Sequence, residues 1–279
     1  MGETINKATI AALSILFIGS IVTAFSAEVV SVSGSSTVLP LGEVAAEAFN
    51  NMQKECIVTV TGGGTGAGIL NIAERKSDIA MASREVTSDE KARFGGNFTQ
   101  FDVGLDGIVI AVSKPIYDAG IKRLTTDQVK KIYAGEIKNW KELGGPDTQI
   151  YAIAREDGSG TKDTFNEDIM GNKTVETPGV STVALGSAEV KTAIVNADNA
   201  IGYLGFSYIG DGAISPLSID GFMPDVQNIK YGLYKLHRHL YFYTYGEPKA
   251  CSLEFIKFVT GPEGQKVAEE IGFIPLQAQ

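Results

Sequence analysis

Residues 154–165, AREDGSGTKDTF, combine an arginine with glycines and small hydroxyl side chains. Arg155 offers charged donors that can bind an oxyanion in a bidentate manner. Ser159, Gly160 and Thr161 precede a predicted helix, whose first N–H groups lack intrahelical partners, and glycine lets a ligand approach the backbone. These residue types predict half of an anion site, although a nucleophile's loop or a turn with a capping serine also fits.

Two earlier loops have a similar composition, Ser35-Ser36-Thr37 and the glycine-rich 62–66 with Thr65. A single loop of this kind fits an ordinary turn and N-cap, but three in one chain favour a shared site. Ser83 ends another predicted strand, and Arg84 follows it. Arg84 either adds a charge-assisted bond to the anion or pairs with Glu85 or Glu156.

Signals for an enzyme are weak. Ser159 lies in D-G-S-G-T, which lacks the spacing of a nucleophile elbow, and GGGTGAG lacks the Gly-Lys-Ser/Thr ending of a P-loop. His237 and His239 share one face of a predicted strand, with no third histidine or nearby cysteine to complete a metal site. We therefore expect no catalysis, cofactor or metal, and keep a secreted phosphatase only as the weaker alternative.

These loops must be positioned by alternating strands and helices. The hydrophobic periodicity predicts strands within 28–36, 56–61, 77–83, 101–113, 149–155, 200–209 and 233–245. It predicts helices within 37–53, 67–76, 87–94, 125–136, 159–171, 186–198, 250–261 and 262–272. In the first helix, Val44, Ala45, Ala48, Phe49 and Met52 are expected on one side. Such alternation is typical of an α/β sheet with helices on both faces, which binds ligands where strands end and helices begin.

Composition limits the function further. The 279 residues are 44% hydrophobic and 20% charged, enough for one or two globular lobes. The formal charge of −9 argues against a nucleic-acid surface, so no nucleic-acid partner is expected. A local set of donors can still bind a small anion within an acidic protein.

Residues 1–27 differ from the rest. An apolar stretch follows Lys7, and Ala24-Phe25-Ser26 fits a cleavage site before Ala27. A cleaved signal peptide and an uncleaved membrane anchor both fit this stretch. Either one places residues 28–279 outside the cytoplasmic membrane. Export permits a disulfide between Cys56 and Cys251, but two buried free thiols are an equal alternative.

Seven segments resemble the phosphate receptors of ABC transporters, the PstS family. They are GSSTVLPL, GGGTGAGI, SDIAMASREVTSDE, KIYAGEIKNW, REDGSGT, NAIGYLGFSYI and EFIKFVTGPEGQKVAEEIGFIPL, spanning residues 29–276. The resemblance implies a type II periplasmic-binding-protein fold, α/β with two lobes and a ligand cleft between them. It places lobe 1 at 28–103 plus 220–279 and lobe 2 at 104–219.

The family's motifs carry over to named positions. Ser36, Thr37 and Thr65 match its hydroxyl-bearing loops in one lobe, and Arg155, Ser159, Gly160 and Thr161 match its Arg-x-x-x-Ser-Gly-Thr set in the other. The expected phosphate-binding residues are Ser36, Thr37, Thr65, Ser83, Arg84, Asp106, Arg155, Ser159, Gly160 and Thr161.

One departure concerns the carboxylate that, in some members, accepts the proton of phosphate. That neighbourhood here reads Ala82-Ser83-Arg84. Asp106, at the first predicted crossing between lobes, is the candidate replacement, with an ordinary Asp-Gly turn as an equal alternative. Asp157 has the same ambiguity. Without such an acceptor, sulfate or another tetrahedral oxyanion becomes a competing ligand.

The resemblance implies an extracytoplasmic, monomeric solute receptor. It would capture inorganic phosphate, close by a hinge motion and deliver the ion to permease subunits of an ABC importer.

Overall fold

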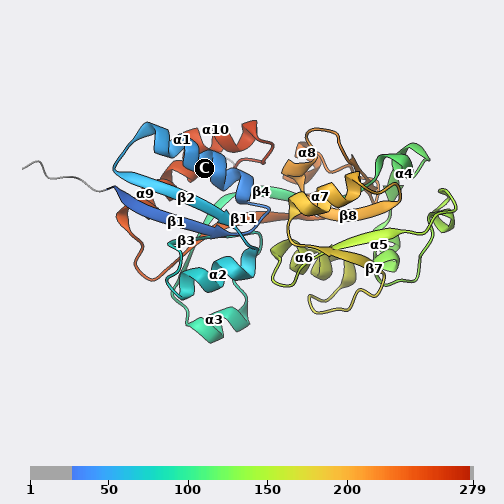
Figure 1. The fold of residues 1–279 in the computed structure, drawn as a ribbon, viewed down its shortest axis with the longest axis horizontal. Helices are drawn as coiled ribbons and strands as arrows, with labels where there is room; N and C mark the ends of the chain where they lie inside the picture. The colour runs from blue at the N-terminus through green and yellow to red at the C-terminus, as the bar shows by residue number, and fades with distance from the viewer. Residues whose placement is uncertain (1–26, 277–279) are drawn as a thin grey trace, which may run out of the picture.

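The protein has two lobes that lie side by side (Figure 1) in a computed structural model that describes residues 27–276. The signal peptide or anchor expected at 1–27 therefore lies almost entirely outside the described residues. Within residues 27–276, no helix is both long and apolar enough to cross a bilayer.

Lobe 1 contains the strands β1 (Glu28–Gly34), β2 (Cys56–Gly62), β3 (Ile79–Ala82), β11 (His237–Tyr245) and the first part of β4 (Phe98–Val112). Their order in the sheet is β2-β1-β3-β11-β4. One face is covered by α1 (Leu39–Met52), α9 (Ala250–Thr260) and α10 (Pro262–Glu270), and the other by α2 (Thr65–Ala73); α3 (Ser88–Phe94) follows β3. The parallel β1–β2 and β1–β3 pairs place the loops that follow these strands at one edge of the sheet.

Lobe 2 continues the sheet as β4-β8-β6-β7, with β6 (Tyr151–Arg155), β7 (Val180–Ala184), β8 (Ala200–Gly205) and β9 (Ser215–Pro216), which pairs with β4. A small second sheet joins β5 (Arg123–Leu124) and β10 (Ser218–Ile219). The helices are α4 (Lys114–Asp118), α5 (Thr126–Tyr133), α6 (Gly160–Phe165), α7 (Ser187–Val195) and α8 (Val226–Lys230). Short 3₁₀ turns span Trp140–Leu143 and Phe206–Tyr208, and a π-helical turn, Asn166–Met170, extends α6.

Two strands connect the lobes. The first ten residues of β4 pair with β11 in lobe 1, and residues 108–112 pair with β8 in lobe 2. The chain returns from lobe 2 along β11, antiparallel to β4. Because both connections are strands of one sheet, they form a short hinge at the middle of the molecule.

The position of the return crossing differs from the expectation at residue 220. Ile229, Tyr234 and Leu236 pack into the hydrophobic core around Trp140 and Tyr203 of lobe 2. We therefore propose a boundary at the start of β11, near residue 237, rather than at 220.

Local signals explain several helix ends. Thr87 and Glu90 form a capping box at α3, and Thr125 with Gln128 forms another at α5. In α1, however, Val44 and Met52 are exposed, while Leu41, Ala45 and Phe49 are buried. The expected apolar face of α1 was therefore partly wrong.

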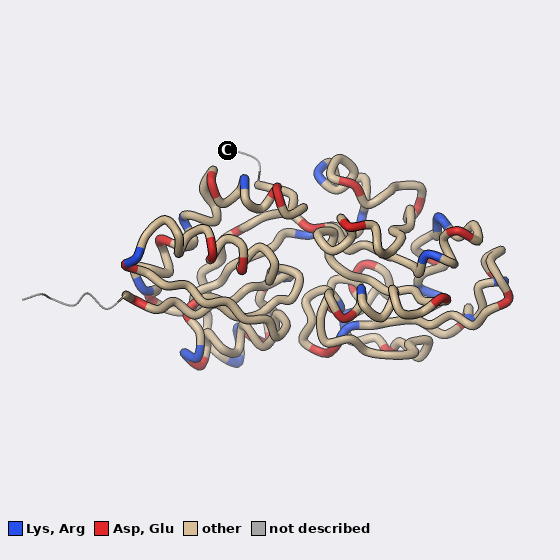
Figure 2. The backbone as a smooth tube through the Cα atoms, turned by 45° about the horizontal axis from the view of Figure 1, so that its top comes forward, with Lys and Arg blue, Asp and Glu red and all other residues tan. Residues whose placement is uncertain are grey.

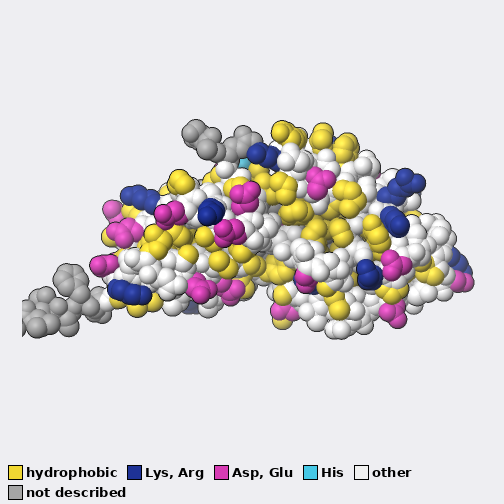
Figure 3. Space-filling view, turned by 90° about the horizontal axis from the view of Figure 1, so that it is seen from above, with side chains coloured by type: hydrophobic (Ala, Val, Ile, Leu, Met, Phe, Trp, Pro, Cys, Tyr) yellow, Lys and Arg dark blue, Asp and Glu magenta, His cyan; other side chains and the backbone are white. Residues whose placement is uncertain are grey.

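Charged side chains are dispersed over the surface. Lys and Arg alternate with Asp and Glu along both lobes (Figure 2), and the face seen in Figure 3 has both signs without a broad basic area. This distribution agrees with the net charge of −9.

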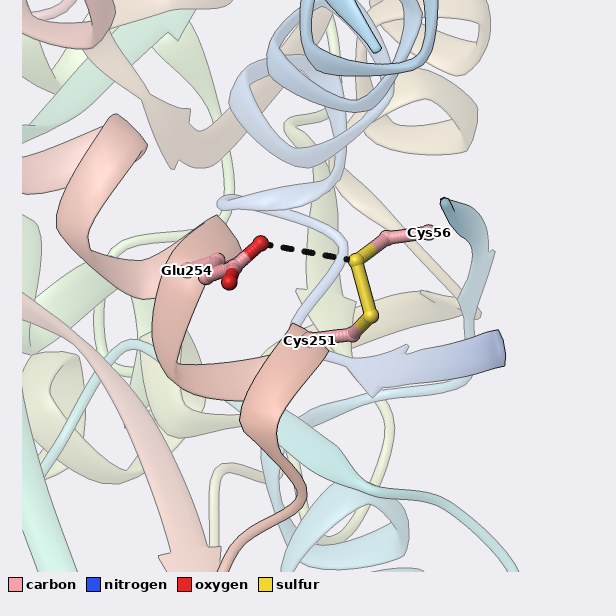
Figure 4. A group of neighbouring side chains, drawn as sticks. All are labelled: Cys56, Cys251 and Glu254. Atoms are coloured by element: carbon pink, nitrogen blue, oxygen red, sulfur yellow. Dashed lines mark hydrogen bonds between the residues drawn. A yellow bond between two sulfur atoms is a disulfide. The ribbon is translucent and has the colours of Figure 1, made fainter. Parts of the chain in front are cut away.

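Cys56 and Cys251 form a disulfide, with a Cα–Cα distance of 5.7 Å (Figure 4). The alternative of two free thiols is therefore wrong. Glu254 Oε2 lies 3.6 Å from the sulfur of Cys56, a contact rather than a donated hydrogen bond because a disulfide sulfur has no proton. The bond joins the start of β2 to the first turn of α9, two parts of lobe 1 that are 195 residues apart.

Candidate anion-binding site

The two lobes meet through hydroxyl groups at the hinge. Thr37 precedes α1 in lobe 1 and Thr161 lies in the first turn of α6 in lobe 2, and their Oγ1 atoms are 2.9 Å apart. Both residues are only 1% exposed. Residues 124 positions apart thus place two polar groups at one buried point.

Arg155, the last residue of β6, forms one side of the site. Its Nε and Nη2 donate to the Glu156 carboxylate at 2.8 Å each. Nη1 donates to Ser187 Oγ at 3.2 Å, and Nη2 also donates to Ser36 Oγ of lobe 1 at 3.0 Å. The arginine is 1% exposed, so burial makes these charge-assisted bonds stronger than they would be in water.

Arg238, on β11, forms the opposite side. Its Nε and Nη2 donate to Asp106 Oδ2 at 3.1 and 2.8 Å. Nη2 also lies 2.9 Å from Thr161 Oγ1 and 3.3 Å from Thr37 Oγ1, so it donates toward both lobes. The register pairs Arg238 directly with Asp106 across β11 and β4, which fixes the guanidinium at the hinge.

Hydroxyl groups of lobe 1 also lie against the start of α6 in lobe 2. Thr65 Oγ1 lies 3.3 Å from Ser83 Oγ and accepts from the Ser83 N–H. A Cβ added to Gly160 would lie 2.6 Å from Ser83 Oγ and 2.7 Å from Thr65 Oγ1. The close approach of the lobes therefore requires glycine at position 160.

Backbone bonds also cross the cleft. The N–H of Gly66, in the first turn of α2, donates to the carbonyl of Gly158 at 2.9 Å. The N–H of Ser187, at the start of α7, points at Ser36 Oγ at 3.4 Å. Helix N–H groups without intrahelical partners thus find acceptors in the opposite lobe, which describes a closed arrangement.

Ser159 and Asp157 have local roles in this arrangement. Ser159 Oγ caps α6 by accepting from the N–H of Lys162 at 3.3 Å. The Asp157 side chain is 99% exposed and pairs with Lys162, so it points to solvent and away from the buried hydroxyls. The sequence left Asp157 open as a possible acceptor, and this geometry gives it no contact with the site.

Arg84 lies at the rim of the cleft and is occupied by carboxylates. Nη1 and Nη2 donate to Glu90, Nη1 also donates to the Glu85 carbonyl, and Nε donates to Asp163 of lobe 2 at 2.7 Å. The partners proposed from the sequence, Glu156 and the carboxylate of Glu85, are not the ones observed. Arg84 is thus an interlobe latch rather than a free anion donor in this closed form.

Asp106 is buried and lies within β4, so the alternative of an ordinary Asp-Gly turn is wrong. Oδ2 accepts from Arg238 and Oδ1 accepts from the N–H of Phe206 at 2.9 Å. Burial raises the pKa of the Asp106 carboxyl, while the charge of Arg238 acts in the opposite direction. Both oxygens already accept hydrogen bonds, which leaves the carboxylate poorly placed to accept a proton from a ligand.

Sequence reasoning missed Arg238 and Ser187. The signal for Arg238 was the alternation of residues 237–242, in which Arg238 shares its face of the strand with Leu240 and faces away from His237 and His239. A charged residue at an inward position needs a partner or a function. Ser187 offered only its place at the start of a predicted helix, a weak signal.

Among the described residues, one group has the composition of a metal site, Cys56, Cys251 and Glu254. Both sulfurs belong to the disulfide and carry no thiolate, so the group does not fit a metal.

The sequence of this chain is similar to those of known proteins. The PBP superfamily domain matches residues 22–263. The phosphate-binding protein PstS of Bacillus subtilis is 34% identical over 88% of this chain and 80% of its own length. PstS of Borreliella burgdorferi is 29% identical over 90% and 91%.

Solved structures agree. A Clostridium perfringens chain, classed by name as a phosphate ABC transporter substrate-binding protein and solved with bound phosphate, has a TM-score of 0.83 and 35% identity. The match covers 90% of this chain and 100% of that one. An ABC-type phosphate transport receptor from Vibrio cholerae has a TM-score of 0.71 and 30% identity over 88% and 100%.

Proposed function

Because this chain belongs to the PBP superfamily and, within it, to the PstS family with its two-lobe type II fold, we propose that it is a receptor for inorganic phosphate. The observation that carries the proposal is the convergence of buried hydroxyls from both lobes beside two buried arginines. The Thr37–Thr161 contact at 2.9 Å marks the centre of this arrangement.

The arginines act chiefly by orienting hydroxyl groups. Each hydroxyl has one proton to donate and two lone pairs that accept. Arg155 donates to Ser36 and Ser187, so their hydroxyl protons remain for an anion. Arg238 donates to Thr37 and Thr161, and one of these two hydroxyls donates to the other in the closed form, so one threonine proton remains for an anion. The positive charges are balanced by Glu156 and Asp106, so an oxyanion is bound mainly by directed donors.

Motion at the hinge would let the receptor alternate between an open and a closed form. Opening at β4 and β11 would separate Thr37 from Thr161 and Ser36 from Arg155, exposing these donors to solvent. Closure would surround the ion and present a closed surface to the permease of an ABC importer. We place this monomeric receptor outside the cytoplasmic membrane, with no catalytic step.

Titration calorimetry of residues 28–279 with phosphate tests the proposal. We expect one ion per chain, competition by arsenate, and no turnover of a phosphomonoester. No heat of binding at millimolar phosphate would refute the receptor, and hydrolysis of the ester would favour a phosphatase.

One observation favours a second candidate, a receptor for tetrahedral oxyanions that includes sulfate. Asp106 and Glu156 are both paired with arginines, so neither is free to accept the proton that distinguishes phosphate from sulfate near neutral pH. If sulfate displaces bound phosphate at similar concentrations, the broader receptor is correct. If it does not, a hydroxyl oxygen accepts the ligand's proton.

A further inference from the structure

A cavity of about 420 Å³ opens beside the buried hydroxyls, between the two lobes. Its wall includes Arg84 and Tyr241 from lobe 1, Asp163 and Lys173 from lobe 2, and Arg238 at the hinge. Arg238 also donates to Thr37 and Thr161, so one residue both lines the cavity and bonds the hydroxyls of the proposed phosphate site.

Part of this guanidinium is unused. Nη1 of Arg238 is buried and has no hydrogen-bond partner among the described residues, while Nε and Nη2 are fully engaged. The residue is 93% buried, since 7% of it is exposed. Two N–H donors on a buried cation without a protein acceptor are costly, so we expect an acceptor from outside the chain, an anion or a water molecule, beside them.

We infer that this cavity is an outer oxyanion subsite, where Arg238 Nη1 holds inorganic phosphate until the hinge opens and separates Thr37 from Thr161. The inference rests on the proposed function. It assigns Arg238 a direct contact with the ligand, in addition to its bond to Asp106, and it makes the cavity the route of entry.

The charges of the cavity wall predict that phosphate binds at this subsite only weakly and briefly. Arg84 is paired with Asp163, and Lys173 is paired with Glu167 at 3.0 Å, so these cations attract an anion only weakly. The directed donors of Nη1 are thus the main attraction. An anion held in this way gains time to reach the inner site without being trapped outside it.

A charge reversal at the mouth tests the route. Lys173→Glu adds negative charge to the cavity wall without changing any residue of the inner site. Lys141→Glu is the matched control, because Lys141 is also an exposed lysine of lobe 2 paired with a carboxylate, Asp147, and does not line the cavity. Rapid-mixing filter binding of ³²P-phosphate gives association and dissociation rate constants separately.

At low ionic strength we expect Lys173→Glu to slow association about 3- to 10-fold relative to Lys141→Glu, with dissociation unchanged and the difference reduced in 0.5 M salt. Equal association rates for the two variants would overturn the inference. Arg238→Lys, which keeps a charge beside Asp106 but lacks the second donor group, should slow association at least 10-fold.

Phosphate binding by the wild-type protein distinguishes failure of the proposed function from failure of the outer subsite. If it binds no phosphate, the proposed function fails. If it binds phosphate but Lys173→Glu behaves like Lys141→Glu, only the outer subsite fails, and this comparison holds even if Arg238→Lys does not fold.

Discussion

Arg155 and Arg238 do similar work on opposite sides of one site, but they are held in place differently. The partner of Arg155 is its sequence neighbour Glu156, which keeps 17% of its side chain exposed. The partner of Arg238 is Asp106, 132 residues away on another strand and 1% exposed. The first pair therefore belongs to one loop, whereas the second joins the two strands of the hinge. Removing one partner should therefore cost less at the local pair, which is partly exposed, than at the buried pair between strands, where it leaves an uncompensated charge.

The largest expected effect tests this difference directly. Asp106→Asn leaves Arg238 as a buried charge without its counter-ion and should lower the free energy of unfolding by about 3–5 kcal/mol. Glu156→Gln should lower it less, by about 1–2 kcal/mol, because water reaches the Glu156 side of the pair and the glutamine oxygen still accepts from Arg155. Urea unfolding followed by circular dichroism measures both. Equal losses would mean that the two pairs are energetically alike.

Arg155, whose ion pair is expected to matter less for folding, should matter strongly for phosphate affinity. Arg155→Ala removes the donor that orients Ser36 and Ser187 and breaks a contact between lobes, so phosphate affinity should fall on the order of 100-fold. Calorimetric titration measures the loss, and Arg155→Ala combined with Glu156→Gln shows how much comes from the unpaired carboxylate. An unchanged affinity would remove Arg155 from the site.

Smaller effects are expected from the hydroxyls that Arg155 orients. Ser36→Ala removes a bond across the cleft as well as a ligand donor and should weaken phosphate binding ~10-fold. Ser187→Ala removes a donor within lobe 2 and should weaken binding only ~3-fold. If Ser187→Ala has the larger effect in the same titration, closure through Ser36 is not part of binding.

The smallest effect concerns Arg84 at the rim, which contrasts with both buried arginines. Burial alone would raise the pKa of Glu90, but hydrogen bonds from Arg84 and Thr87 outweigh it and lower this pKa below its ordinary value of 4.5. A lowered folded-state pKa gives stability that is present above pH ~4.5 and lost as pH falls through the folded-state value.

We therefore expect Glu90→Gln to be less stable than wild type at pH 6 by about 1 kcal/mol or less and to show a flatter stability profile between pH 5 and 3. Urea midpoints across this range check the prediction. Parallel profiles for the two proteins would show that Glu90 does not titrate in this window.

The sequence predicts much of this fold because its signals are local. The alternation of short apolar runs with helical periodicity anticipates the order of the main strands and helices, and capping boxes at Thr87 and Thr125 begin two of these helices. The elements that it missed, such as α4, α8 and the two-residue strands, are short and carry little periodicity.

Pairings between distant segments could not be predicted in the same way. The sequence predicts Arg155, Ser159 and Thr161 as site residues because they lie within one stretch of seven residues. The Asp106–Arg238 pair and the Arg84–Asp163 latch depend on how β4 and β11 pair and on how far the lobes close. Asp106 was chosen for its place at a crossing, but its partner required the register of the two strands.

The division of lobe 1 between the two ends of the chain has a consequence for biosynthesis. During synthesis β1, β2 and β3 emerge first, yet the strand that β3 pairs with, β11, and the helices that cover the sheet, α9 and α10, are made last. Lobe 2 is one continuous segment and can be completed while those early strands still wait. In a nascent chain, the edge of β3 that pairs with β11 therefore stays unpaired until His237–Tyr245 have been synthesised.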